Sequence, residues 1–293
     1  MQAIILVVTI TALAAASFTD IKKREVPDWL NYGLVVFGLG TNLLLSVAFW
    51  TWTYIAYSVF GMLALFAIAY FMFYAGQWGG GDSKMLIGLG SVFGLPFFFT
   101  SPYIDVSSFI ISFWFNLLIT GTIYALLWSA FLAVKNRKRF AKELKSGLRK
   151  KAKTRKLVLL IALAILAASV AFKEPRLKLL LMAVSVLSML SVYLSVFSKS
   201  VERAGMLKLV NPQALTEGDW IAKNVVVGNR IITGPKDLGV SKKQIFLLNR
   251  LHGQGKVKRI LIKVGIPFVP SFFAALLLTI AYGNLLMLLL RIV

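Results

Sequence analysis

Residues 19–28 have the sequence TDIKKREVPD and follow directly after an apolar N-terminal segment. A second polar motif, GGGDSK at residues 79–84, comes directly before another apolar segment. Each motif places one carboxylate, Asp20 or Asp82, at the end of a predicted membrane helix. Carboxylates in such positions are energetically costly, so they are candidates for function. Two that can approach each other are typical of an acid/base pair.

The composition excludes an ordinary soluble globular protein. Hydrophobic residues make up 58% of the 293 residues, 15% are charged, and the mean hydropathy is +0.79. These values are typical of polytopic membrane proteins. The chain has no Cys, which excludes disulfides, thiolate metal sites and a Cys nucleophile.

A helix needs about 20 mostly apolar residues to cross a bilayer. Eight segments are candidates, and the sixth is short enough to be re-entrant instead. The first segment lacks a leading basic region, and Asp20 stands where a cleavage site would need small residues. We therefore interpret it as a retained helix and not as a cleaved signal peptide. The eight predicted spans are about 3–19, 30–50, 54–75, 84–101, 108–134, 157–172, 177–197 and 266–290.

The Lys and Arg residues predict the orientation of these spans. With the N-terminus outside, 29 of the 33 basic residues fall in predicted inside segments, as the positive-inside rule expects. Both Asp20 and Asp82 then lie at the cytoplasmic face. The loops around residues 23, 80, 145 and 230 are predicted to be inside, and those around 103 and 174 outside.

The formal net charge of +22 raises the question of nucleic acid. In a membrane protein the basic loops are better explained as anchors to anionic inner-leaflet lipid, and we predict no nucleic-acid partner. Within 135–156, Phe140, Leu144 and Leu148 recur every four residues among Lys and Arg. This spacing predicts a basic amphipathic helix that lies on the membrane surface and continues the fifth span.

Residues 199–264 are the one segment long and polar enough to fold in water. Residues 225–227 and 230–232, separated by Gly-Asn, predict a β-hairpin. Ser241-Lys-Lys-Gln is a capping box that opens a helix ending at Gly253, and the alternation over 257–264 predicts another strand.

The predicted fold is an all-α polytopic membrane protein of about eight transmembrane helices, with a small α+β cytoplasmic module. Its predicted parts are a membrane core with spans one to five over 1–134, a basic loop with an inserted helical hairpin over 135–198, the α+β module over 199–264, and a final transmembrane helix over 265–293.

Two carboxyl groups that share one proton can hydrolyse a peptide bond. One takes a proton from the attacking water, and the other donates to the carbonyl oxygen or the leaving amine. Close approach enforces this state, because two adjacent carboxylates do not both ionise cheaply. The glycines at 79–81 allow a substrate strand to approach the backbone. The alternative is that they only form the turn into the fourth span.

The motifs Asp20-x-Lys22-x-Arg24-x-Val26-Pro27 and Gly79-x-Gly81-Asp82-x-Lys84 resemble the two signatures of the type IV prepilin peptidases, which include archaeal preflagellin (archaellin) peptidases. These enzymes are GxGD aspartyl proteases. LTEGDW at 215–220 and GIPFVP at 265–270 resemble the archaeal branch. The resemblance covers about 1–134 and 199–290, whereas 135–198 looks like an insertion of two spans into a six-span pattern.

The resemblance implies a membrane aspartic endopeptidase that cleaves class III signal peptides from prepilin- or archaellin-like precursors. Cleavage would follow a short basic leader and precede the hydrophobic helix, at the cytoplasmic face of the plasma membrane. No cofactor or metal is implied. The methyltransferase activity of many bacterial members accompanies a Cys-rich zinc motif, so a chain without Cys favours the archaeal type. By matching position, Asp20 and Asp82 are the catalytic pair, and the supporting motif residues are Lys22, Arg24, Pro27, Gly79, Gly81 and Lys84.

Several marked residues have competing interpretations. Glu217 and Asp219 are candidates to bind the basic leader of a substrate, or belong to a solvated loop. Lys22, Arg24 and Lys84 either tune the pair or anchor the inside face. Asp28 is interpreted as a cap of the second span. His252 is interpreted as a surface or capping group, since one His argues against a metal site.

A cation- or proton-coupled transporter is an alternative function for the same Asp residues. Against it, both acids lie at helix ends, and no paired broken helices occur near mid-bilayer. A third reading is a scaffold of a secretion apparatus, in which both acids would be dispensable. Substitution of each Asp separates the three functions.

Overall fold

The computed structural model describes residues 2–95 and 109–292, and it is mostly helical. It divides into two compact units: residues 1–126, 211–258 and 265–293 form the first, and residues 127–210 and 259–264 form the second. Within the described residues, five helices are long and apolar enough to cross a membrane: Ala3–Lys23, Asp28–Ala48, Thr53–Tyr74, Phe109–Lys135 and Pro175–Met206.

These five helices agree with the predicted polytopic architecture. They overlap the predicted spans one, two, three, five and seven. In the same order, they correspond to α1 (Gln2–Lys23), α2 (Asp28–Ala48), α3 (Thr53–Tyr74), α5 (Phe109–Lys135) and α8 (Pro175–Val201). The other three predicted spans correspond to shorter or more polar helices. Span four is α4 (Gly80–Phe93), and residues 96–101 of its predicted range, like position 103, lie outside the described residues. Span six is α7 (Ala152–Val170).

The last predicted span, 266–290, is two helices and not one: α10 (Val269–Tyr282) and α11 (Leu285–Ile292). The chain breaks at Gly283, whose φ of 68° is one that glycine adopts readily. The side chain of Asn116 in α5 holds the break. Its Nδ2 donates to the Gly283 carbonyl at 2.7 Å, and its Oδ1 accepts from the Leu285 N–H at 3.0 Å.

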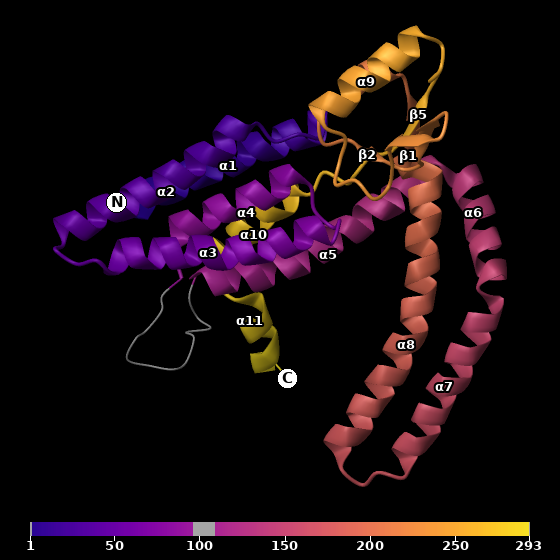
Figure 1. Ribbon diagram of the computed structural model, residues 1–293. Coiled ribbons are helices and arrows are strands. Elements are labelled where there is room, and N and C mark those ends of the chain that lie inside the picture. The colour runs from indigo at the N-terminus through magenta and orange to yellow at the C-terminus, as the bar shows by residue number, and fades with distance from the viewer. Residues whose placement is uncertain (1, 96–108, 293) are drawn as a thin grey trace. The chain divides into compact units, whose positions relative to one another are not determined.

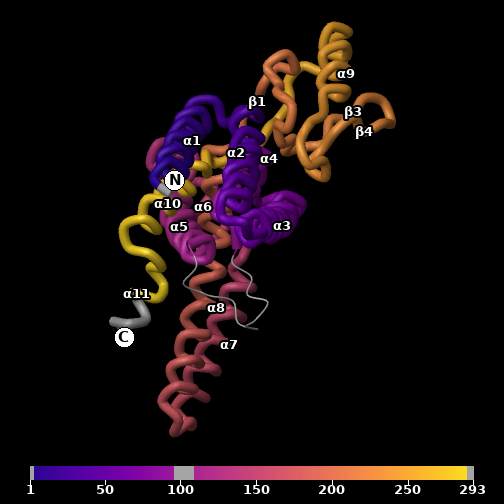
Figure 2. Tube along the Cα trace, turned by 90° about the vertical axis from the view of Figure 1, so that its left-hand side faces the viewer, coloured from indigo at the N-terminus to yellow at the C-terminus, as the bar shows by residue number. Residues whose placement is uncertain are grey.

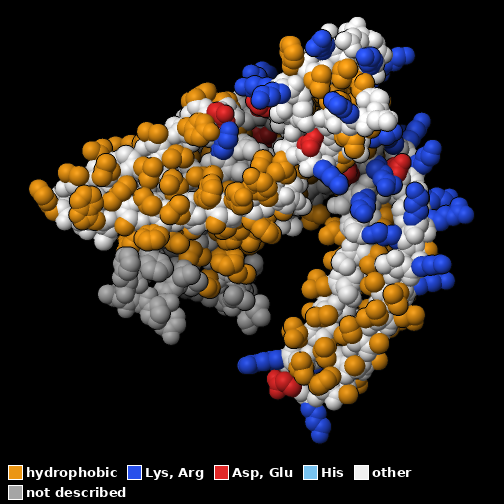
Figure 3. All heavy atoms as spheres, viewed as in Figure 1, with side chains coloured by type: hydrophobic (Ala, Val, Ile, Leu, Met, Phe, Trp, Pro, Cys, Tyr) orange, Lys and Arg blue, Asp and Glu red, His pale blue; other side chains and the backbone are white. Residues whose placement is uncertain are grey.

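In the first unit, α4 packs against α2 and α3, and α10 packs against α1 (Figures 1 and 2). The apolar core lies between these helices and α5. Outward faces of α1, α2 and α3 carry exposed apolar side chains, as Figure 3 shows, which suits contact with lipid. The fully buried side chains of this core include Leu13, Met85, Leu86, Leu89, Phe113, Phe272 and Leu276.

Glycines allow α4 to approach its neighbours very closely. A Cβ at Gly90 would lie 2.5 Å from the Gly61 carbonyl oxygen of α3, and one at Gly38 of α2 would collide with Ser91. Small residues permit this type of backbone contact between membrane helices. Asn42 of α2 adds two hydrogen bonds to carbonyl groups in the last turns of α4, at 3.2 and 3.3 Å. The helix that carries Asp82 is therefore fixed on two sides by backbone contacts.

The polar segment of the first unit contains the predicted hairpin and helix. Strands β3 (Val225–Val227) and β4 (Arg230–Thr233) pair antiparallel. Helix α9 (Lys242–Gly253) begins at the predicted capping box, in which Ser241 Oγ accepts from Gln244 N at 3.3 Å and Gln244 Oε1 accepts from Ser241 N at 2.9 Å. The same segment also contains a 3-10 turn (Pro212–Ala214) and the short strand β2 (Trp220–Ile221).

The second unit is built on the antiparallel pair α7 and α8, preceded by α6 (Arg137–Lys150). A π-helical turn (Glu202–Met206) follows α8, and strands β1 (Leu207–Val210) and β5 (Ile260–Lys263) pair antiparallel. The predicted strand over 257–264 is thus present as β5, whereas β1 was not predicted from the sequence.

The predicted amphipathic helix is present as α6, and α8 packs against part of its apolar stripe. Its position on a membrane surface stays a prediction. The Phe140 and Phe197 rings lie 5.7 Å apart, and Gly147 faces Val196 closely. Lys and Arg side chains occupy the outward face of α6 (Figure 3).

Candidate active site

Asp20 lies in the last turn of α1 and is almost enclosed, with 7% of its surface exposed. Its Oδ2 accepts a hydrogen bond of 3.0 Å from the backbone N–H of Val269, the first residue of α10. Free N–H groups at a helix N-terminus favour a negative charge. The C-terminal part of the chain therefore supplies the binding partner of the first predicted catalytic carboxylate.

Arg24 also connects the end of α1 to the segment that precedes α10. Its backbone has a φ of 63° just beyond the end of α1, and its N–H donates to the Asp20 carbonyl at 2.9 Å. Its Nη1 donates to the Gly265 carbonyl at 2.9 Å. Asp20 and Arg24 also interact electrostatically with the hydroxyl of Tyr124 in α5. Arg24, one of the predicted supporting residues, thus contacts the segment that leads into α10.

Asp82 lies in the first turn of α4 and is partly exposed. Its Oδ2 accepts from the backbone N–H of Gly79, which precedes the helix, at 3.1 Å. Desolvation of the carboxyl and the nearby charge of Asp20 together raise the pKa of Asp82 from 3.8 to about 7, against the lowering effect of the Gly79 N–H. The two motif carboxyls are therefore close enough to influence each other's ionisation.

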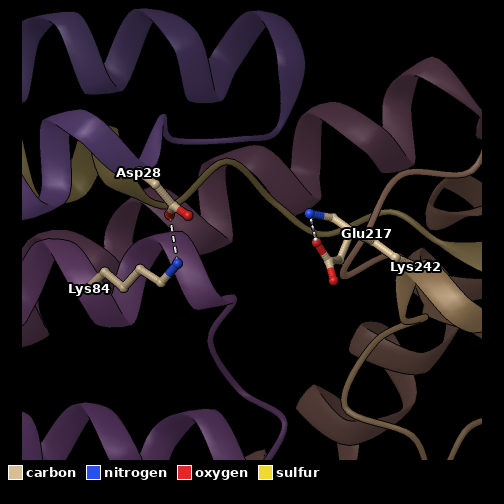
Figure 4. A network of polar contacts seen from close by, with 4 residues as sticks. All are labelled: Asp28, Lys84, Glu217 and Lys242. Carbon is tan, nitrogen blue, oxygen red and sulfur yellow. Dashed lines mark hydrogen bonds and ion pairs between the residues drawn. The ribbon is translucent and has the colours of Figure 1, made fainter.

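The two motifs meet along the starts of α2 and α4. A Cβ at Gly81 would lie 3.3 Å from the Cβ and Cγ2 of Val26, so a side chain here would require Val26 to shift slightly. Lys84 Nζ lies 2.6 Å from Asp28 Oδ1 (Figure 4) and 5.4 Å from the centre of the Tyr32 ring. Asp28 is the first residue of α2, after Pro27, and its side chain binds Lys84.

The remaining predicted residues lie in different surroundings. Lys22 is exposed, with its Nζ 5.6 Å from the centre of the Phe18 ring. Glu217 forms an exposed ion pair of 3.4 Å with Lys242 (Figure 4). Asp219 Oδ2 accepts from its own turn, from the Thr216 N–H at 2.8 Å.

His252 lies near the end of α9, where its Nδ1 is 2.7 Å from the Val257 carbonyl oxygen, as expected of a capping group. Among residues 2–95 and 109–292, no group of three or more His, Cys, Asp or Glu is placed to hold a metal ion.

Sequence reasoning missed the N–H of Val269 and the position of Tyr124. A backbone N–H group is present at almost every residue, so the sequence pattern does not indicate which one binds a carboxylate. A tyrosine within an apolar span does not by itself indicate a functional site. Pro267 and Pro270 were the available hint, because prolines near the start of a helix indicate where its free N–H groups begin.

Two carboxyls with different surroundings and mutual electrostatic influence can hold one proton between them at near-neutral pH. That arrangement can activate a water molecule with one group and protonate a departing atom with the other. It can also bind a single cation, which is the chemistry of the alternative function.

Comparison with known proteins agrees with the motifs. Residues 7–135, which contain both motifs, match the type IV leader peptidase family. The chain is 39% identical over 80 residues to a preflagellin peptidase of Methanocaldococcus jannaschii, covering 27% of this chain and 34% of the relative. It is 32% identical over 135 residues to that of Methanococcus voltae, covering 42% and 54%. The chain thus matches about a third to a half of these relatives' length. The resemblance drawn from the two motifs is confirmed, since residues 7–135 match the type IV leader peptidase family.

Proposed function

We propose that this protein is a membrane aspartic endopeptidase that removes class III signal peptides from prepilin- or archaellin-like precursors. The observation that carries the proposal is the meeting of two separate motifs, at Val26 with Gly81 and at Asp28 with Lys84, beside the carboxyls of Asp20 and Asp82. The likeness to preflagellin peptidases supports the precursor class.

In the proposed reaction, one carboxyl is ionised and the other is protonated. The ionised group takes a proton from a water molecule while the oxygen of that water attacks the scissile carbonyl carbon. The protonated group donates to the carbonyl oxygen, and a proton then passes to the leaving nitrogen as the C–N bond breaks. Both products leave with ordinary termini, and no cofactor or methyl donor takes part.

The supporting motif residues have distinct proposed roles. Gly79 offers its N–H to Asp82, and Gly81 lets the two motifs approach. Pro27 fixes the start of α2, and Lys84 binds Asp28. Arg24 secures the segment before α10, whereas Lys22 is exposed and suits anchoring at the inside face.

The proposed substrate has a basic leader followed by a hydrophobic helix. Glu217 and Asp219 are acidic residues on one turn and remain the candidates to attract such a leader. The hydrophobic helix would lie in the membrane beside the bundle, with the scissile bond at its cytoplasmic end. The proposal therefore includes a location in the plasma membrane, with the site facing the cytoplasm.

The test is co-expression with a tagged prepilin-like precursor, followed by N-terminal sequencing of the product. We expect one cut, between the basic leader and the hydrophobic helix. Recovery of the folded, inserted protein together with an uncut precursor would contradict the proposal. Ion flux in proteoliposomes that depends on the same Asp residues would favour the transporter.

The orientation and the basic segment are tested separately. The native chain has no Cys, so single Cys residues at 23, 80, 145 and 230 can be compared with one at 174. We expect an impermeant reagent applied outside the cell to label only position 174, and labelling at 145 would contradict the proposed topology.

Replacing 135–198 by a short polar linker should weaken binding to anionic vesicles while specific cleavage is retained.

A further inference from the structure

The loop that carries Asp82 is short and strongly bent. It joins the end of α3 to Gly79, at the start of α4. Gly76 N–H donates to the Phe73 carbonyl at 2.9 Å, and Gln77 N–H donates to the Met72 carbonyl at 2.9 Å, so α3 ends in a glycine-terminated turn. Gly76 has a φ of 66°, which other residues adopt only with strain.

A tryptophan anchors this loop from the inside. Trp78 is 7% exposed, and the centre of its ring system lies 5.8 Å from the rings of Phe268 and Phe272 and 6.4 Å from that of Trp114. Phe268 directly precedes Val269, the residue that binds Asp20. The inner face of the Asp82 loop is thus packed on the elements that hold the other carboxyl.

A second tryptophan covers the loop from the outside. Trp220 of β2 places its Cη2 and Cζ3 atoms 3.5 and 3.7 Å from the position that a Cβ on Gly76 would occupy. Gly76 itself has no Cβ, so these distances place the Trp220 ring next to the bend of the turn. The two residues are far apart in the sequence, and Trp220 belongs to the polar segment of the first unit.

The Trp220 ring is itself held in place. The backbone just before it pairs with a second segment, since Gly218 N–H donates to the Val240 carbonyl and Val240 N–H donates to the Asp219 carbonyl, both at 2.9 Å. Gly239 and Gly218 approach so closely that a side chain on Gly239 would collide with backbone. The next residue, Ile221, is buried. Trp220 therefore extends from a well-supported turn.

We infer that Trp220 is a positioning residue for the proposed reaction: it holds the Gly76 turn against the bundle and so fixes the loop that presents Asp82. The inference rests on the proposed function for its kinetic test. No contact of Trp220 with substrate is required. Its effect passes through Gly76 and the few residues between that glycine and Asp82.

The kinetic test compares Trp220→Ala, Trp220→Phe and a matched control, Phe246→Ala. Phe246 is an aromatic residue of the same segment, on α9, and it is 74% exposed. We expect Trp220→Ala to lower kcat by about ten- to a hundredfold with a smaller change in KM, because misplacement of a catalytic group by about 1 Å has effects of this size. Trp220→Phe lacks the outer indole atoms that approach Gly76 and should fall between Trp220→Ala and the wild type, and Phe246→Ala should match the wild type.

A second readout does not depend on cleavage. A spin label attached to Cys at position 77, which is exposed in the loop, reports loop mobility in the otherwise Cys-free chain. We expect Trp220→Ala to increase the mobility of the label and Phe246→Ala to leave it unchanged. If the wild-type protein cuts no precursor, the proposed function fails, and the label alone decides the inference. An unchanged label, or a loss of kcat no larger than that of Phe246→Ala, overturns it.

Discussion

Asp20 and Asp82 occupy opposite ends of their helices, and they are held in different ways. Asp20, in the last turn of α1, binds a backbone N–H that is 249 residues away in the sequence. Asp82, in the first turn of α4, binds one that is three residues away. The placement of Asp20 therefore depends on correct folding of the C-terminal helix, whereas that of Asp82 depends mainly on its own loop. A pair of similar side chains thus combines one long-range and one local support.

The largest expected effect removes either member of the pair. Asp20→Asn and Asp82→Asn should each lower cleavage by about a hundredfold to ten-thousandfold, the range typical of a lost general acid or base. The amide oxygen still accepts the Val269 or Gly79 N–H, so both variants should insert and fold. The cleavage rate is measured with a tagged precursor, and gel filtration in detergent checks that each variant is folded. Ser83→Ala serves as the neighbouring control, and full activity in either Asn variant would refute the assignment.

The next prediction separates the two supports. Val269→Pro removes the N–H that binds Asp20 at a position, the first of α10, where a helix tolerates proline. A hydrogen bond to a charged group contributes about 1.5–3 kcal/mol, so kcat should fall by about ten- to a hundredfold. Val269→Ala keeps the N–H and truncates the same buried side chain. If the two variants lose equal activity, the hydrogen bond is not what positions Asp20.

The pH dependence follows from the raised pKa of Asp82. A carboxyl with a pKa of about 7 keeps its proton up to neutral pH and loses it above. The proposed reaction needs one proton on the pair of Asp20 and Asp82. We therefore expect kcat/KM to fall about tenfold as the pH rises from 6 to 8. The measurement is a pH–rate profile with a short precursor peptide. A profile that stays flat through pH 8 would show that Asp82 does not supply the proton.

The smallest expected effect tests how closely the motifs must approach. Gly81→Ala adds a methyl group 3.3 Å from the Val26 side chain and should push the starts of α2 and α4 apart slightly, with a loss of about threefold in kcat/KM. Gly80→Ala, one residue earlier, meets nothing closer than Phe73 at 4.0 Å and should be neutral. Equal activity of the two variants would mean that the Val26 contact is unimportant for the site.

Local patterns predicted local structure well. The capping box at Ser241, the hairpin at Val225–Val227 and Arg230–Thr233, and the end of α9 at Gly253 are all present, because each is decided by residues close in sequence. Five of the eight predicted spans correspond to helices long and apolar enough to cross a membrane, since about 20 consecutive apolar residues leave few alternatives. The catalytic roles of Asp20 and Asp82 stay predictions, although the motifs do meet.

Long-range contacts were beyond sequence reasoning. Nothing near Asn116 indicates that its amide holds the break between α10 and α11, although Gly283 followed by Asn284 was a usable stop signal for a helix. The apolar stripe of α6 correctly predicted an amphipathic helix but not the neighbouring helix that packs on it. A stripe that suits lipid also suits a neighbouring helix, and α8 covers part of it.

The close glycine contacts of α4 bear on how freely the sequence around Asp82 can vary. A randomised library would retain glycine at 38, 61 and 90, where any side chain meets backbone or Ser91. Exposed positions on α2, such as Val36 and Leu44, would accept many apolar residues. Adaptation to a new precursor would therefore arise in the polar segment and the loops. Helix α4 would remain a fixed support while its surroundings diverge.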